Sequence, residues 1–273
     1  MSTRIRLTSV AVALLGLPFG FSLAAPHAAE PETVGNFTAV QGQVQMSRAG
    51  TGQPVSVKLA DTVASKAMIE TLDSSRAKAL FLDESMLAIG EYSKIQVQEQ
   101  TYDPRRGKRS MVFHLLEGKA RALVTKTFPG AGSRFEIRTS SAVAATQAGY
   151  FVVWIEQGAG ARGVPNSHAN QNLSAGNEGG PSVLPNREFT GIANIGDTGS
   201  IDFTSSGQTV SVRPGHFAYA STGQPPSAPM PLTKGIPLQV SQAIRDTSVV
   251  NAPKPETPYE TLRAMAGSTI PRP

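Results

Sequence analysis

The chain has 273 residues, of which 40% are hydrophobic and 6% aromatic, with a formal net charge of +5 at neutral pH. This length fits one large or two small domains, and the weakly basic balance does not indicate a nucleic-acid-binding protein. The chain contains no cysteine, which excludes disulfides, cysteine metal sites, thiol catalysis and a lipoprotein anchor.

The N-terminus has the pattern of a secretory signal peptide. Arg4 and Arg6 precede an apolar run over residues 7–21, and small residues follow up to Ala24. An uncleaved anchor is the alternative, but a spanning helix usually needs about 20 apolar residues, and proline and glycine interrupt this run. We therefore expect residues 1–24 to be cleaved, leaving a periplasmic or secreted protein without a stable membrane anchor.

Two runs with apolar residues at every second position predict a hairpin near the start of the mature chain. Their apolar positions are Val40, Val44 and Met46 in the first run, and Val55, Val57 and Leu59 in the second. A turn containing glycine and proline over residues 50–54 separates them. The short connection favours antiparallel pairing.

Three further short runs fill residues 74–103. Their apolar residues recur at every second position and are separated by turns rich in Asp, Ser and Gly, which is typical of antiparallel strands that bury one face. Asp103, Pro104 and Gly107 then supply the chemistry of a hairpin turn. Strands are predicted next over residues 111–116, 119–124, 134–138 and 150–155.

The order of several of these residues resembles the FecR domain, an all-β periplasmic module of iron-responsive signalling with the motifs F-x-D-x-S, G-x-x-S and Y-D-P. The matching residues are Asp61, Ile69, Thr71, Ser75, Phe81, Asp83, Ser85, Gly90, Ser93, Tyr102, Asp103 and Pro104. The resemblance implies a strand over residues 67–71 and an antiparallel β-sandwich-like domain over residues 34–156. Family members also carry T-P-x-A followed by R-G-T-x-F. This chain has Ser140 in place of the proline and lacks the arginine, while Gly149 and Phe151 keep the rest of the pattern, so no role of that arginine is carried over.

The rest of the chain divides by composition. Residues 157–188 are rich in Gly, Asn and Pro, with too few large aliphatic residues to offset the entropy of ordering, and we predict a mobile loop. Four short strands over residues 189–222 predict a β-meander that packs on the FecR-like domain. Residues 223–273 are Pro-rich and predicted to be a largely disordered tail, in which residues 238–250 are the candidate for one short helix.

Strand parity also predicts the core. Its expected members are Val44, Leu59, Ile69, Phe81, Ile89, Ile95, Phe113, Leu115, Phe135, Ile137, Phe151, Val153 and Phe203. The single tryptophan, Trp154, is expected to pack rather than to form a ligand platform.

No pattern of catalytic or metal-binding residues stands out in the sequence. The four histidines, His27, His114, His168 and His216, lack ligand spacing. Asp83 and Glu84 are adjacent carboxylates, but in a turn between strands such residues normally accept backbone hydrogen bonds. We therefore expect no enzymatic activity, no cofactor and no metal.

One group of residues has a possible binding use. Arg105, Arg106, Lys108 and Arg109 cluster at the predicted hairpin tip, and Lys119, Arg121, Arg134 and Arg138 lie on the polar sides of later strands. If these strands are neighbours, the charges form a cationic face for an anionic lipopolysaccharide, polysaccharide or acidic protein. The alternative is a solvated surface that protects strand edges.

The function we expect is a non-enzymatic periplasmic binding or scaffolding module with a protein or envelope-polymer partner, as the FecR resemblance implies. A component of iron-responsive or other envelope signalling is one alternative, although only six residues precede the apolar run, too few for a sigma-factor-binding domain. A glycan- or envelope-binding accessory protein is another, although the low aromatic content argues against a sugar cleft.

Overall fold

The computed structural model describes residues 32–48, 52–130, 132–157, 188–232 and 237–248. The predicted signal peptide, most of the predicted loop at 157–188 and much of the predicted tail lie outside these residues. Within the described part, the chain is almost entirely β-strand, with one α-helix and one short 3-10 helix. The predicted all-β fold class is confirmed. None of the helices in the described part is long and apolar enough to cross a membrane.

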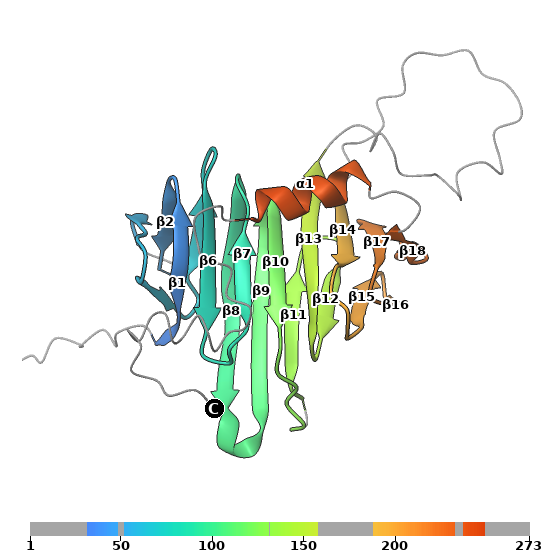
Figure 1. The fold of residues 1–273 in the computed structure, drawn as a ribbon, viewed down its shortest axis with the longest axis horizontal. Coiled ribbons are helices and arrows are strands. Elements are labelled where there is room, and N and C mark those ends of the chain that lie inside the picture. The colour runs from blue at the N-terminus through green and yellow to red at the C-terminus, as the bar shows by residue number, and fades with distance from the viewer. Residues whose placement is uncertain (1–31, 49–51, 131, 158–187, 233–236, 249–273) are drawn as a thin grey trace, which may run out of the picture. The chain divides into compact units, whose positions relative to one another are not determined.

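The described strands form two sheets of nine strands each (Figure 1). The first sheet has the order β18 (Met230–Pro231), β17 (His216–Ser221), β14 (Glu188–Asn194), β13 (Gly149–Gln157), β10 (Lys119–Val124), β7 (Met86–Ile89), β6 (Arg76–Phe81), β1 (Thr33–Gln41) and β4 (Thr62–Ala64). The second has the order β16 (Gln208–Val212), β15 (Ile201–Ser205), β12 (Val143–Thr146), β11 (Arg134–Arg138), β9 (Lys108–Glu117), β8 (Ser93–Asp103), β5 (Met68–Thr71), β2 (Val44–Ser47) and β3 (Val55–Ser56). Neighbouring strands are antiparallel except β9 and β11, which run parallel.

The main core lies between the two sheets. Four phenylalanines contact one another across it: Phe81 and Phe151 from the first sheet, and Phe113 and Phe135 from the second. Each buried ring stabilises the fold by about 1.5–3 kcal/mol relative to an exposed one. Every residue predicted for the core is buried except Leu59.

Leu59 is a correction to the predicted core, because its side chain is 66% exposed. The second strand of the first hairpin, β3, ends at Ser56. Val57, which follows it, is buried in place of Leu59. Asp61 ends the extended run, since its carboxylate accepts the Lys58 N–H at 2.7 Å and its own N–H donates to the Lys58 carbonyl. The predicted antiparallel pairing is confirmed for β2 and β3, whereas Val40, expected in the same strand as Val44 and Met46, lies on β1 in the first sheet.

The four strands predicted over residues 189–222 are present, but they do not form one meander. β14 and β17 pair with each other in the first sheet, whereas β15 and β16 form a hairpin beside β12 in the second. The chain crosses between sheets because Ile192 and Ala218 on one side, and Phe203 and Val212 on the other, face the same core. These strands therefore continue both sheets.

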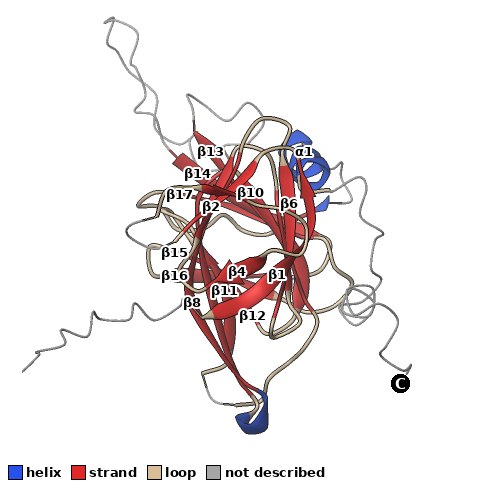
Figure 2. Ribbon diagram, turned by 90° about the vertical axis from the view of Figure 1, so that its left-hand side faces the viewer, coloured by secondary structure: helices blue, strands red, loops and turns tan. Residues whose placement is uncertain are grey.

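The predicted tail contains two described elements, β18 and the helix α1 (Leu238–Asp246). The short helix expected within residues 238–250 is confirmed. Residues 223–232, which were expected to be disordered, are described and include β18. Figures 1 and 2 show α1 on the outside of the first sheet, beside β10 and β13. The tail is ordered there because Val240 and Ala243 pack against apolar side chains on that face.

Candidate functional site

The first candidate feature is the tip of the β8–β9 hairpin, which extends beyond the neighbouring strands (Figure 1). A single 3-10 turn, Pro104–Arg106, joins the two strands. The Asp103 carboxylate accepts the Arg106 N–H at 3.1 Å, and Gly107 adopts a φ of 59°, a left-handed conformation that favours glycine. The turn chemistry predicted from the sequence is confirmed.

The tip is supported by the segment that precedes β11. The Gly107 carbonyl accepts the Gly130 N–H at 2.9 Å, and the edge of the Tyr102 ring meets Phe128 with 5.8 Å between ring centroids. These contacts hold the backbone of the tip in a fixed position.

Three of the predicted cationic residues are exposed at this tip, and we call Arg105, Arg106 and Lys108 the basic tip. The Arg106 side chain is 85% exposed, and its Nε lies 3.5 Å from an Asp103 carboxylate oxygen. An exposed pair of this kind contributes at most about 1 kcal/mol. The tip has a net positive charge, because three cations outnumber the one carboxylate.

Arg109 is a correction to the predicted site, because it is fully buried. Its guanidinium pairs with Asp83, also buried, at 3.4 Å and donates to the Gln147 carbonyl at 2.9 Å. The guanidinium also lies over the Phe128 ring, 4.9 Å from its centroid. Burial lowers the pKa of Arg109, and the charge of Asp83 opposes that shift. Arg109 is therefore part of the core and is inaccessible to a partner.

The adjacent carboxylates Asp83 and Glu84 lie in different environments, one buried and one at the surface. Asp83 accepts the backbone N–H of Ser85 at 3.1 Å, as expected for a turn residue, and also the Ser85 hydroxyl at 2.6 Å. Glu84 forms an ion pair with Lys126 at the surface. The arrangement is that of two structural carboxylates.

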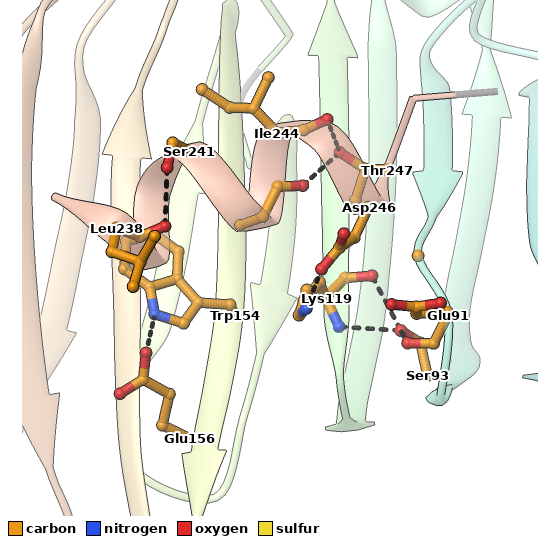
Figure 3. Close-up of polar contacts among 12 residues, drawn as sticks. Glu91, Ser93, Lys119, Trp154, Glu156, Leu238, Ser241, Ile244, Asp246 and Thr247 are labelled. Carbon is orange, nitrogen blue, oxygen red and sulfur yellow. Dashed lines mark hydrogen bonds and ion pairs between the residues drawn. The ribbon is translucent and has the colours of Figure 1, made fainter. Parts of the chain in front are cut away.

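Lys119 and Arg121 do not lie with the basic tip. Lys108 begins β9, whereas Lys119 follows its other end, and ten residues of strand span about 33 Å. Lys119 pairs with Asp246, and Arg121 donates to the Thr247 carbonyl at 2.9 Å (Figure 3 shows Lys119, Asp246 and Thr247). The predicted single cationic face is therefore two separate regions.

The cations at this second region bind the C-terminal end of α1. Arg76, which was not predicted as a site residue, donates from Nε to the Asp246 carbonyl at 2.7 Å. Positive side chains are favourable at a helix C-terminus, where unpaired carbonyls give a partial negative charge. We call Arg76, Lys119 and Arg121 the cationic clamp.

Arg134 and Arg138 lie on β11 in the second sheet and have acidic neighbours. Arg134 pairs with Glu99, and Arg138 pairs with Glu136, each at 2.7 Å. The Ser110 hydroxyl and then Arg134 lower the pKa of Glu99 by stabilising its charged form. These two arginines are part of a mixed-charge surface, not of a cationic face.

The apolar surface beneath α1 is the second candidate feature, and strand parity produces it. β13, β14 and β17 send one set of side chains into the core and the other outward. The outward set, which we call the helix-covered face, is Val152, Trp154, Ala193, Phe217 and Tyr219. Trp154 is 2% exposed and meets Tyr219 edge-on at 5.9 Å. The prediction that Trp154 packs is confirmed.

A half-buried carboxylate, Glu156, borders this face. Glu156 accepts the Trp154 indole N–H at 3.1 Å (Figure 3). Burial raises the pKa of Glu156, while the indole and the charge of Lys119 act in the opposite direction. Burial and the charge of Glu156 raise the pKa of Tyr219 to about 12.

Two other kinds of site, a ligand pocket and a metal site, have little support in the described part of the chain. An open depression of about 340 Å³ is lined mostly by small and polar residues, among them Ser133, Gln147 and Asp202, without an aromatic ring on which a sugar would stack. No group of three or more His, Asp or Glu side chains that could hold a metal ion occurs in the described residues. Burial, and then the charge of Arg138, lower the pKa of His114.

Comparison with known proteins supports the resemblance. Residues 67–163, about a third of the chain, match the family model described as FecR protein. Two crystal structures of a "putative anti-sigma factor" from Parabacteroides distasonis ATCC 8503 align over 60% of this chain and 59% of theirs, with 10% and 11% identity and a TM-score of 0.39. The chain thus spans about three fifths of those structures. A search of curated proteins found no match.

Proposed function

Taking the FecR match of residues 67–163 as the premise, we propose that this chain is a non-enzymatic binding module of the cell envelope that acts in envelope signalling. Its partner is a protein with an acidic surface, and the basic tip is the contact. The chain reaches the periplasm through the signal peptide predicted at residues 1–24. The observation that carries the proposal is the projecting hairpin with three exposed cations on a fixed backbone.

The basic tip suits a carboxylate-rich partner. Arg105 and Arg106 each present a planar fork of donors that binds a carboxylate with two hydrogen bonds. Because the Asp103 hydrogen bond and the Gly107 turn already fix the backbone, binding orders only side chains and costs less entropy than ordering a loop. Exposed cations on a projection also steer an acidic partner during association.

The test is photo-cross-linking in intact envelopes from a tip that carries a photoreactive residue in place of Pro104. The tip variant changes Arg105, Arg106 and Lys108 to Glu. The matched control changes three exposed cations elsewhere, Arg48, Lys58 and Arg213, to Glu, which alters the net charge by the same amount. Thermal unfolding of both variants is expected to match the wild type, because all six side chains are exposed.

We expect a protease-sensitive adduct that falls at least tenfold in the tip variant and persists in the control. Equal adducts in both variants would contradict the role of the tip. An equal loss of adduct in both variants would show that binding depends on the net charge of the protein and not on the tip. An adduct that resists protease and contains lipopolysaccharide would replace the protein partner with an anionic polymer.

A further inference from the structure

The helix-covered face is the starting point of a second inference, independent of the basic tip. Three of its residues are large aromatics on β13 and β17, Trp154, Phe217 and Tyr219, each at most 7% exposed. The outward side of a sheet at the surface is usually polar, so an apolar outward side requires a cover. α1 packs against this face, together with Met230 and Leu232 near β18 and Ile195 after β14.

α1 has little intrinsic stability as a helix and depends on its contacts with the sheet. It has only nine residues, and isolated helices shorter than about 12 residues are marginal in water. Its N-cap is Pro237, which makes no side-chain cap hydrogen bond, and its first turn contains no acidic residue. Only Val240 and Ala243 in the helix are buried, while Leu238 is 63% exposed.

The contacts of α1 also define what the face selects. Val240 and Ala243, three positions apart on one side of the helix, belong to the same apolar cluster as the aromatic residues, and Ile244 packs against that cluster. Asp246, in the last turn, meets the cationic clamp, which binds its carboxylate and its carbonyl (Figure 3). The face therefore recognises a small apolar pair at i and i+3, followed by an acidic residue near the helix C-terminus.

From this geometry we infer that the helix-covered face is a helix-binding site that α1 occupies in the free protein, and that a partner protein docks there with an amphipathic helix of the same chemistry. The partner helix lays its apolar pair on Trp154, Phe217 and Tyr219 and places an aspartate or glutamate in the cationic clamp. Such helix-in-groove binding is a common mode of protein recognition. α1 competes with the partner from within the same chain, so it sets a threshold for binding.

The only tryptophan of the chain reports directly on this site. A release variant changes Val240 and Ala243 to Asp, which weakens the apolar side of α1 and leaves every sheet residue unchanged. A matched control changes Leu238 and Gln242, both exposed positions on α1, to Asp. Acrylamide quenching of Trp154 fluorescence in the full mature chain is expected to rise at least threefold in the release variant, with a red-shifted emission, and to stay near the wild-type value in the control.

A synthetic peptide of residues 237–248 then serves as the probe for the partner helix. Added to the release variant, it is expected to restore protection of Trp154. The same peptide with Asp246→Lys is expected to bind at least tenfold more weakly. A designed helix that keeps only the i, i+3 apolar pair and the last-turn acid is expected to bind within tenfold of the native peptide.

Three results would overturn the inference: unchanged quenching in the release variant, failure of both acid-bearing peptides to protect Trp154, or equal binding of the Lys peptide. Sedimentation distinguishes another occupant, because a wild-type dimer that the release variant cannot form would assign the face to α1 of a second copy. Circular dichroism of the release variant must retain the β spectrum, and the basic-tip variant must show wild-type quenching, since the two sites are separate.

Discussion

At the scale of single residues, Arg109 shows how neighbours in sequence mislead. It follows Arg105, Arg106 and Lys108, and proximity alone placed it in the same exposed cluster. Strand parity contained the correct answer, since Arg109 shares its side of β9 with the buried residues Met111 and Phe113. Parity could not identify its partner, because Asp83 is 26 residues away and the two meet only through the fold.

We predict that the pair of Asp83 and Arg109 is strongly coupled. Asp83→Asn or Arg109→Met alone leaves a buried charge without its partner and is expected to destabilise the protein by about 3–5 kcal/mol. The double variant leaves no buried charge and is expected to cost at least about 1 kcal/mol less than the sum of the single variants. Urea unfolding of the four proteins measures this difference. Costs that add to within about 0.5 kcal/mol would show that the two groups do not interact.

At the scale of elements, the pairing of β13 with β14 determines where Trp154 lies. Trp154 is directly opposite Gly191 in the register. A Cβ on Gly191 would approach the Trp154 ring to 2.1 Å, so only glycine allows the indole to lie across the neighbouring strand.

We predict that Gly191→Ala displaces the Trp154 ring and lowers stability by about 1–3 kcal/mol, as for other overpacked positions. Acrylamide quenching of Trp154 is expected to increase, because the shifted ring loosens the contact with α1. Gly207→Ala is the control: its positive φ makes alanine strained, but nothing lies within 4 Å of the added carbon. That variant is expected to lose stability with unchanged quenching. Unchanged quenching in Gly191→Ala as well would show that the ring has room to move.

The elements themselves were largely predictable, and their partners were not. Alternation identified most strands between Arg76 and Ser221, because a period of two directly reports a half-buried strand. The strand at residues 67–71 was expected from the FecR resemblance instead, and β12 was not predicted. It does not report which sheet a strand joins, so the β15–β16 hairpin was placed in a meander. A helix was also expected within residues 238–250, and the structure places it at Leu238–Asp246. The face that it covers was not predictable, because Trp154 in that face precedes the helix by more than 80 residues.

At the scale of the whole molecule, the β framework is larger than the segment that matches FecR. The match spans residues 67–163, yet the same core includes Val34 and Phe37 before it and Ile192, Phe203 and Val212 after it. Strands outside the match extend both ends of each sheet: β1, β4, β14, β17 and β18 in the first, and β2, β3, β15 and β16 in the second. The account therefore depends on one cooperative framework that holds both the basic tip and the helix-covered face.

Hydrogen exchange of the full mature chain, read by mass spectrometry, tests this claim most directly. If the framework is cooperative, buried amides of β1, β14 and β17 exchange with the same global free energy of opening as those of β8 and β9, and their protection is lost together as urea is added. α1 is expected to exchange earlier, consistent with a helix that leaves its face. Earlier collective exchange of β14–β17, with β8 and β9 still protected, would contradict the account by showing a separate unit attached to the FecR segment.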